Sequence, residues 1–294
     1  MTGPALRIVV TGASGLLGRH AVAHLQAANR LALARGMAPR FDIVALDHAA
    51  FGDDARLMQA LRGAGAVLHF AGVSRGDPAR VAAGNPALAR RLVATCRRVG
   101  ARPHLVHANS IRCGEDTPYG RSKRAASALL AKLGGGFCDL ILPHVFGEGG
   151  RAGHNSVTAN FLQAVQAGQR PLVDPAGHVA LVHAGQVARQ AIRAATDRLT
   201  GALPVAADRP MTVPALYARI LALQADYRAT RLPDLQGGFD RALYSSYLTA
   251  LDPSAWLRPV PAPAAVQAAQ SAGWQVTPQR IDPGDRQRLD FSLF

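Results

Sequence analysis

Short apolar runs alternate with longer amphipathic segments through the first half of the chain. Such runs are typical of buried strands, and the segments between them carry apolar residues at helical spacing. The predicted strands lie at 6–10, 41–46, 66–70, 104–108 and 139–142, and the predicted helices at 18–30, 86–99 and 119–133. Strands that alternate with crossover helices predict an α/β fold with a doubly wound, Rossmann-type parallel sheet.

The pattern loosens after residue 147. A helix is predicted at 157–167, prolines interrupt a mostly helical remainder, and a short helix is expected at 264–272. We predict a Rossmann domain over 1–150, with 182–200 returning to it, and a smaller, mainly helical substrate-binding region over 151–294.

Composition points to a globular protein, with 18% charged and 49% hydrophobic residues. No run of about 18 apolar residues predicts a membrane span, and the first residues lack the charged start and cleavage site of a signal peptide. We therefore expect no membrane partner and a cytoplasmic location. Cys96, Cys113 and Cys138 are far apart and lack metal-ligand spacing, so no metal site is expected.

The formal net charge of +14 is a feature shared with many nucleic-acid-binding proteins. Of the 33 basic residues, 31 are arginines and two are lysines, scattered along the predicted helices without interleaved aromatic residues. That scatter forms no binding stripe, so we expect no nucleic-acid partner. A positive field instead favours an anionic small-molecule substrate such as a sugar diphosphate.

A glycine-rich turn links the first predicted strand to the first predicted helix. Glycine permits a tight turn and lets the backbone approach a pyrophosphate, and the helix N-terminus offers free N–H groups. Glycines alone occur in any turn, but this position between strand and helix is typical of dinucleotide binding. The cofactor-binding residues predicted here are Gly12, Ser14, Gly15, Leu16, Leu17 and Gly18.

Asp47 closes the second predicted strand, where a carboxylate can accept hydrogen bonds from both hydroxyls of the adenosine ribose. Its charge would repel a 2′-phosphate and so favours NAD over NADP, whereas His48 beside it could tolerate a phosphate. An ordinary strand-end role stays open, because Asp47 lies farther from Gly18 than the roughly 20 residues of the usual fingerprint. Residues expected against the adenosine side of the cofactor are Phe70, Ala71 and Gly72.

Tyr119 and Lys123 lie four residues apart in a predicted helix and so share one face. A neighbouring cation and the nicotinamide charge would lower the tyrosine pKa, so that the phenol could exchange a proton while hydride moves. Nearly all the other basic residues of the chain are arginines, so a lysine at position 123 stands out. A compact ammonium can hold ribose hydroxyls in ways that a guanidinium cannot. Ser110 ends the fourth predicted strand, and is either a hydrogen-bond partner of the reacting oxygen or a cap for the next turn.

These residues together resemble the extended short-chain dehydrogenase/reductase (NAD-dependent epimerase/dehydratase) family over most of the chain. Several stretches are most similar to one branch, the reductase domain of the CapF-type capsular-polysaccharide enzymes. The stretches are 69–75, 118–123, 146–147 with 154–157, and 243–248.

The resemblance implies reduction, with NADPH, of the C4 ketone of a UDP-2-acetamido-2,6-dideoxy-4-hexulose in surface polysaccharide biosynthesis. It implies Tyr119 as proton donor, Ser110 as the group that polarises the carbonyl, and Lys123 as the partner of ribose and phenol. It also implies a homodimer. The further residues assigned to the site are Pro143 and Val145 for the cofactor, and Val73, Ser74, Arg75, His144, Asn155 and Ser156 for the substrate.

Some features depart from that branch. Its members carry a zinc-binding cupin domain that epimerises C3, and no cluster of histidine and glutamate ligands is evident in this sequence. Asp47 stands where an NADPH-dependent enzyme would prefer a basic residue, and Ile141 and His144 replace the family's arginine and asparagine. Altered sugar specificity is therefore expected.

Two other functions stay open. A nucleotide-sugar 4-epimerase or dehydratase with bound NAD would use the same three residues, and Asp47 favours this function because it favours NAD. The sequence beside Ser110 lacks the carboxylate pair of dehydratases. A catalytically silent NAD(P)-binding protein is the second, and the intact serine, tyrosine and lysine argue against it.

Overall fold

The computed structural model describes residues 4–153, 156–251, 274–278 and 289–293. The chain forms two compact units, Met1–Ala250 and Leu251–Phe294. In the second unit, β10 (Trp274–Pro278) pairs antiparallel with β11 (Leu289–Leu293). The helix predicted at 264–272 lies outside the described residues. The described helices and the two other sheets belong to the first unit.

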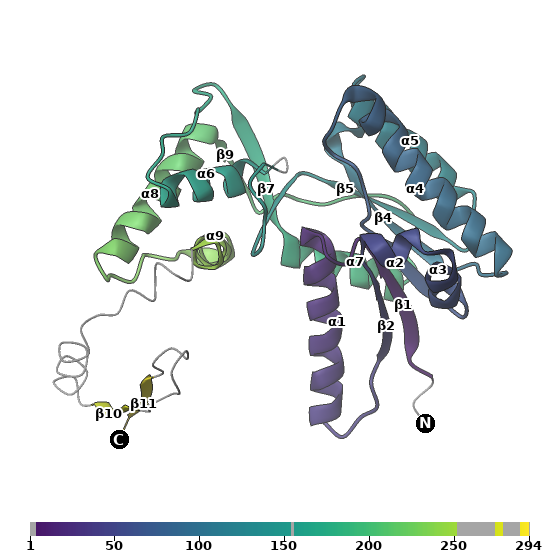
Figure 1. The fold of residues 1–294 in the computed structure, drawn as a ribbon, viewed down its shortest axis with the longest axis horizontal. Helices are drawn as coiled ribbons and strands as arrows, with labels where there is room; N and C mark the ends of the chain where they lie inside the picture. The colour runs from purple at the N-terminus through teal and green to yellow at the C-terminus, as the bar shows by residue number, and fades with distance from the viewer. Residues whose placement is uncertain (1–3, 154–155, 252–273, 279–288, 294) are drawn as a thin grey trace, which may run out of the picture. The chain divides into compact units, whose positions relative to one another are not determined.

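The main sheet of the first unit has six parallel strands in the order β2-β1-β3-β4-β5-β8 (Figure 1). The strands are β1 (Leu6–Thr11), β2 (Phe41–Leu46), β3 (Ala66–His69), β4 (His104–Ser110), β5 (Phe137–Leu142) and β8 (Gly201–Pro204). The order reverses between β1 and β3, and ligands of such sheets bind beyond the carboxyl ends of the strands at this switch point. The predicted α/β class and doubly wound sheet are therefore confirmed.

Helices cover both faces of this sheet, as the alternation of strand side chains requires. Ile8 and Val10 of β1 belong to one buried cluster and Val9 to the other. The first face is covered by α1 (Leu16–Ala34) and α7 (Ala184–Thr196), which lie side by side (Figure 1). The second face is covered by α3 (Asp54–Leu61), α4 (Pro78–Arg98) and α5 (Pro118–Ala131), with the short α2 (His48–Gly52) at the end of β2. None of the described helices combines the length and apolar character needed to cross a membrane.

A second, three-stranded sheet lies in the later part of the unit, in the order β6-β7-β9. β6 (His144–Phe146) runs parallel to β7 (His178–His183), and β9 (Arg209–Thr212) runs antiparallel to β7. The helices beside it are α6 (Val157–Gln166), α8 (Val213–Arg228) and α9 (Gly237–Ala250). The sequence did not predict β6 to β9, which are short and contain proline or histidine. The predicted boundary at residue 150 falls after β6, and the division into a cofactor and a substrate part stays a prediction.

The predicted start of α4 at Pro86 is wrong, because the helix begins at Pro78. The Asp77 carboxylate accepts a hydrogen bond from the Arg80 N–H at 2.8 Å, and Pro78 occupies the first turn, where its missing N–H costs nothing. Pro86 is then a buried interior residue that removes one helical hydrogen bond. Its neighbour Asn85 anchors the helix to the loop after β3 through hydrogen bonds with the Val73 N–H and C=O.

The packing of α4 on the sheet predicts the cost of truncating its buried face. Leu92 is fully buried in the second cluster, so Leu92→Ala should lower the free energy of unfolding by about 3 kcal/mol. Leu33→Ala is the control, because Leu33 is 57% exposed on α1 and its loss should cost less than about 0.5 kcal/mol. Urea unfolding followed by circular dichroism measures both, and equal losses would contradict this packing.

Candidate active site

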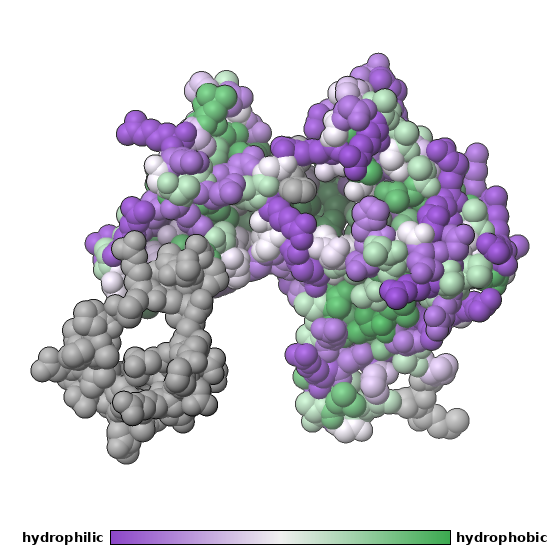
Figure 2. Space-filling model, in the orientation of Figure 1, coloured by the Kyte–Doolittle hydropathy of each residue, from purple (hydrophilic) through white to green (hydrophobic). Residues whose placement is uncertain are grey.

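A cavity of about 510 Å³ opens at the carboxyl ends of β1, β3, β4 and β5. Figure 2 shows the surface hollowed between the second sheet and the α4–α5 side, with hydrophilic side chains on the rim. The lining is assembled from loops far apart in the sequence, which meet because parallel strands end at one edge of the sheet. The predicted site residues that line it are Gly12, Ser14, Gly15, Leu16, Leu17, Gly18, Phe70, Gly72, Val73, Ser74, Ser110, Tyr119, Lys123, Pro143, His144, Val145 and Ser156.

The glycine turn after β1 has the geometry that a dinucleotide pyrophosphate needs. Gly12 has a φ of +68°, a conformation that favours glycine, and a β-carbon on it would lie 2.7 Å from the Ala71 nitrogen. A β-carbon on Gly18 would lie 2.2 Å from the Gly12 carbonyl oxygen, so α1 starts directly against the turn. The N-cap of α1 is Gly15, whose position offers no side-chain cap, and the first turn carries no acidic residue. The N–H groups and dipole of this 19-residue helix therefore face the cavity and fit a pyrophosphate.

Four of the described residues predicted for the site, Asp47, His48, Ala71 and Arg75, do not line this cavity. Asp47 is the N-cap of α2, where its Oδ1 accepts a hydrogen bond from the Ala50 N–H at 2.8 Å. Ala71 donates its N–H to the Thr11 hydroxyl at 3.4 Å, and Arg75 is hydrogen-bonded to the Gly153 carbonyl. His48 is the first residue of α2. Asn155 lies outside the described residues.

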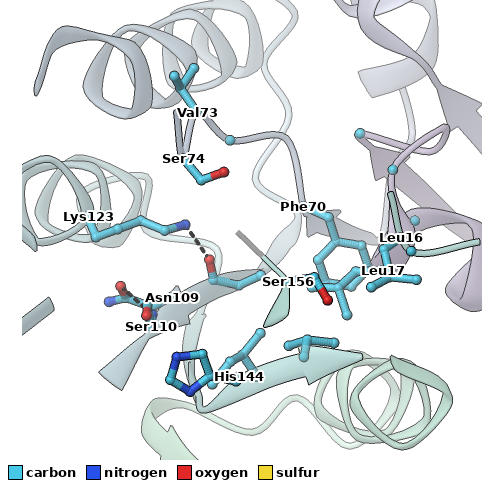
Figure 3. Close-up of a pocket in the computed structure, with 18 of the residues that line it drawn as sticks. Leu16, Leu17, Phe70, Val73, Ser74, Asn109, Ser110, Lys123, His144 and Ser156 are labelled. Atoms are coloured by element: carbon cyan, nitrogen blue, oxygen red, sulfur yellow. Dashed lines mark hydrogen bonds between the residues drawn. The ribbon is translucent and has the colours of Figure 1, made fainter. Parts of the chain in front are cut away.

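The predicted catalytic residues come from β4 and α5 and face the same cavity. Ser110 ends β4, and its hydroxyl accepts a hydrogen bond from the Arg112 N–H at 3.2 Å, as the N-cap of a short 3-10 helix. Thr117 caps α5, so that Tyr119 lies in the first turn and Lys123 one turn later. Figure 3 shows Lys123 and Ser110 on one wall, with Leu16, Leu17 and Phe70 on the other. Both roles proposed for Ser110, cap and active-site hydroxyl, are thus compatible with one geometry.

Tyr119 is shielded from solvent, and this decides its protonation. Burial raises the pKa of the phenol, while a hydrogen bond with Ser110 and the Arg112 guanidinium lower it only in part. Arg112 lies over the Tyr119 ring, 5.7 Å from its centroid. In the protein alone, desolvation of the phenolate outweighs the nearby charge. The phenol is therefore protonated at neutral pH. The lowered pKa predicted from the sequence includes the charge of a bound nicotinamide and stays a prediction.

Lys123 is buried, with only 7% of its surface exposed. Its Nζ donates a hydrogen bond to the Ala108 carbonyl at 2.6 Å, drawn as a dashed line in Figure 3. Burial lowers the pKa of Lys123 to about 8, and the Asp139 charge opposes that shift. The ammonium form therefore predominates at neutral pH.

The described lining of the cavity is rich in cations and contains no carboxylate. Its members that are cationic at neutral pH are Arg19, Arg112, Lys123 and Arg151. Arg19 is tied to both sides of the opening, through the Ser14 carbonyl at 3.0 Å and the Gly149 carbonyl at 2.5 Å. Such a lining attracts a polyanionic ligand.

Several lining residues were missed by sequence reasoning. Asn85 belongs to the middle of α4 and Asn109 to the interior of β4, where neither spacing nor motif sets a polar residue apart. Arg112 could have been predicted from the sequence, because it follows the predicted site residue Ser110 by two positions. Arg19 and Arg151 were hidden by the abundance of arginine in the chain.

A cluster of His20, Glu148 and His183 also escaped sequence analysis, because its members are distant in the chain. Their ligand atoms lie within 4.8 Å of one another, close enough for a metal ion. The hydrogen bonds favour another role. The Gly185 N–H donates to His183 Nδ1 at 3.3 Å, which leaves the ring proton on Nε2, and this atom donates to Glu148 Oε2 at 2.7 Å. The cluster therefore ties α1 and β7 to the loop that carries the lining residue Gly149.

Comparison with known proteins identifies relatives that share this organisation. A curated UDP-2-acetamido-2,6-beta-L-arabino-hexul-4-ose reductase of Pseudomonas aeruginosa is 28% identical over 264 residues, which cover 87% of this chain and 68% of that protein. The capsular polysaccharide assembling protein CapF of Staphylococcus aureus superposes with a TM-score of 0.65 at 21% identity, over 94% of this chain and 69% of that chain. The UDP-glucose 4-epimerase of Thermus thermophilus, solved with NAD, superposes with a TM-score of 0.64 at 18% identity, over 83% of this chain and 99% of that chain.

The family assignment rests on a family model that matches more than half of the chain. The model of the NAD dependent epimerase/dehydratase family matches residues 8–201, which include the glycine turn, Ser110, Tyr119 and Lys123. The resemblance predicted from these residues is confirmed. The chain belongs to the NAD dependent epimerase/dehydratase family and is an NAD-dependent oxidoreductase of the extended short-chain dehydrogenase type.

Proposed function

We propose that this protein uses NAD(P)H to reduce the C4 ketone of a UDP-linked amino sugar in the synthesis of a surface polysaccharide. The observation that carries the proposal is the convergence of Ser110, a protonated Tyr119 and Lys123 on the cavity that the glycine turn also lines. The cations around this cavity suit the diphosphate of a nucleotide sugar. The 28% identity to a reductase of a UDP-linked keto-hexulose supports the same substrate class.

Each catalytic residue has a role that follows from its surroundings. When bound, the dinucleotide supplies the hydride that adds to the carbonyl carbon. Tyr119 donates its phenolic proton to the carbonyl oxygen, and the raised pKa means that this proton is present at neutral pH. The Ser110 hydroxyl accepts the Arg112 N–H and is hydrogen-bonded to Tyr119, so it lies beside the proton donor, where it can donate to the same carbonyl oxygen. Lys123 stabilises the phenolate left behind and holds the nicotinamide ribose.

The finer assignments belong to this proposal as well. Asp47 can serve both its helix and a cofactor, because Oδ1 accepts the Ala50 N–H and Oδ2 can accept ribose hydroxyls, which favours NAD over NADP. The UDP-sugar is assigned to the side of the cavity formed by Val73, Ser74, His144 and Ser156, together with Asn155 and Arg75. We further propose a homodimer that acts in the cytoplasm.

A second candidate is a nucleotide-sugar 4-epimerase that retains NAD. Asp47 favours it, and so does a fold shared at a TM-score of 0.64 with the Thermus thermophilus 4-epimerase. Epimerisation begins with oxidation of an alcohol, which requires a proton acceptor rather than a donor. The two candidates differ in what purifies with the protein, because an epimerase holds its NAD through the cycle and a reductase exchanges it.

The first test of the reductase proposal removes the proton donor. Tyr119→Phe keeps the ring but loses the phenol, so kcat for reduction of a UDP-4-keto-sugar should fall at least about 100-fold. Cofactor affinity, measured by fluorescence titration, should stay within about twofold. Tyr217→Phe is the matched control, since Tyr217 packs on Phe161 away from the catalytic residues and its loss should leave kcat unchanged. Full activity of Tyr119→Phe would refute the mechanism.

Cofactor choice is tested at Asp47. Asp47→Asn retains an N-cap for α2 but removes the charge, so the ratio of NADPH to NADH affinity should rise about tenfold. Asp53→Asn is the control, because Asp53 caps α3 in the same way through the Arg56 N–H at 3.0 Å. Wild-type protein that already prefers NADPH in steady-state kinetics would contradict the assignment of Asp47.

A further inference from the structure

Four polar side chains cross the interior of the main sheet at one level, beneath the catalytic residues. Thr11 on β1 is in register with His69 on β3, His69 with His107 on β4, and His107 with Asp139 on β5. All four are at least nine-tenths buried. Side chains at such positions are ordinarily apolar, and a buried polar group costs free energy unless it is hydrogen-bonded. We name this row, Thr11, His69, His107 and Asp139, the polar row.

Each member of the polar row contacts the next one along the sheet. The Thr11 hydroxyl and His69 Nδ1 are 2.8 Å apart, and the His69 and His107 rings stack with centroids 5.9 Å apart. Burial lowers the pKa of both imidazoles, that of His107 to about 4, so both rings are neutral at pH 7. Asp139 is therefore the only charged member of the row.

Asp139 is held by three hydrogen bonds. His107 Nδ1 donates to Oδ1 at 2.8 Å, while the Asn109 amide and the Ser127 hydroxyl each donate to Oδ2 at 2.7 Å. Burial works to raise the pKa of Asp139, but these bonds outweigh it and hold the pKa below its usual range. The carboxylate is thus ionised although it is buried, and a buried charge requires a counter-charge.

Lys123 is the cation whose pKa the Asp139 charge works to raise. Lys123 and Ser127 lie one helical turn apart on α5, and both reach the same stretch of β4 and β5. Lys123 bonds the Ala108 carbonyl, between His107 and Asn109, which are the two β4 partners of Asp139. The groups whose charge acts on the ammonium are Asp139 and Cys113, and the ammonium in turn acts on both imidazoles of the row.

We propose that Asp139 is a positioning residue that keeps Lys123 charged and fixes the end of β4 beside the reacting groups. Asp139 also acts on Ser110 by way of Asn109. The Asn109 amide NH2 donates to Asp139, and its Oδ1 accepts the Ser110 N–H at 2.9 Å. One buried carboxylate thus supports both the cation and the serine of the catalytic set. The inference rests on the proposed role of Lys123 and deepens it, because it states where the charge of that residue comes from.

The test exploits a property of this chain, which contains two lysines. Protein labelled with 13Cε-lysine gives two signals, and the exposed Lys132 serves as the internal reference. In the wild-type protein Lys123 should titrate near its pKa of about 8. In Asp139→Asn its pKa should fall by about one unit or more, because the variant removes the negative charge that works to raise it. The alkaline limb of the kcat profile should move to lower pH by the same shift.

Ser127→Ala is the matched control. It removes one hydrogen bond from the same carboxylate oxygen but keeps the charge, so the Lys123 pKa should change by less than about 0.3. If Asp139→Asn does not fold, Asp139→Thr removes the same charge with a side chain suited to a strand. In the wild type, a carboxyl signal of Asp139 that is protonated at pH 7 would also overturn the proposal.

The outcomes separate this proposal from the function on which it rests. An unchanged Lys123 pKa in the neutral variants would refute the role of Asp139 even if Tyr119 proves to be the proton donor. A lowered pKa without turnover of any UDP-keto-sugar would support the role of Asp139 and refute the substrate. The lysine titration needs no substrate, so the two failures are distinguishable.

Discussion

The burial of the Lys123 ammonium is the constraint on which the catalytic end of the sheet depends. A lysine that is 7% exposed loses most of its hydration, and the protein must replace it with oriented groups. The Ala108 carbonyl accepts a hydrogen bond from the ammonium, and the Asp139 charge acts on it. The backbone of β4 and one side chain of β5 therefore both stabilise this cation. Burial of the imidazoles themselves lowers the pKa of both rings of the polar row, and the Lys123 charge acts in the same direction.

Sequence analysis captured what depends on local patterns. Strands β1 to β5 of the parallel sheet appeared as apolar runs, and the turn from Gly12 to Gly18 was recognisable from its place between strand and helix. Each of these features is complete within a short run of consecutive residues. Lys123 stood out for a different reason, because nearly all other basic residues of the chain are arginines.

What escaped prediction depends on contacts between distant segments. Asp139 resembled any residue near a strand start, and its role appears only when β4 and α5 pack against it. The start of α4 was missed for another reason, since Asp77 and Pro78 are a local start signal and Pro86 offered a second one in the same segment. The burial that raises the Tyr119 pKa in the protein alone is a property of the folded site and cannot be derived from the Tyr119–Lys123 spacing.

The distribution of protons in the site bears on the direction of the reaction. Ketone reduction consumes a proton at the carbonyl oxygen, and a phenol whose pKa is raised by burial holds that proton at neutral pH. Oxidation of an alcohol would instead require the phenolate, which the desolvated surroundings of Tyr119 disfavour. After the proton has left, the Arg112 guanidinium over the ring and the hydrogen bond with Ser110 are the groups that favour the phenolate. Both are in place before any ligand binds, so the protein alone already holds the groups that can stabilise the anion left by proton donation.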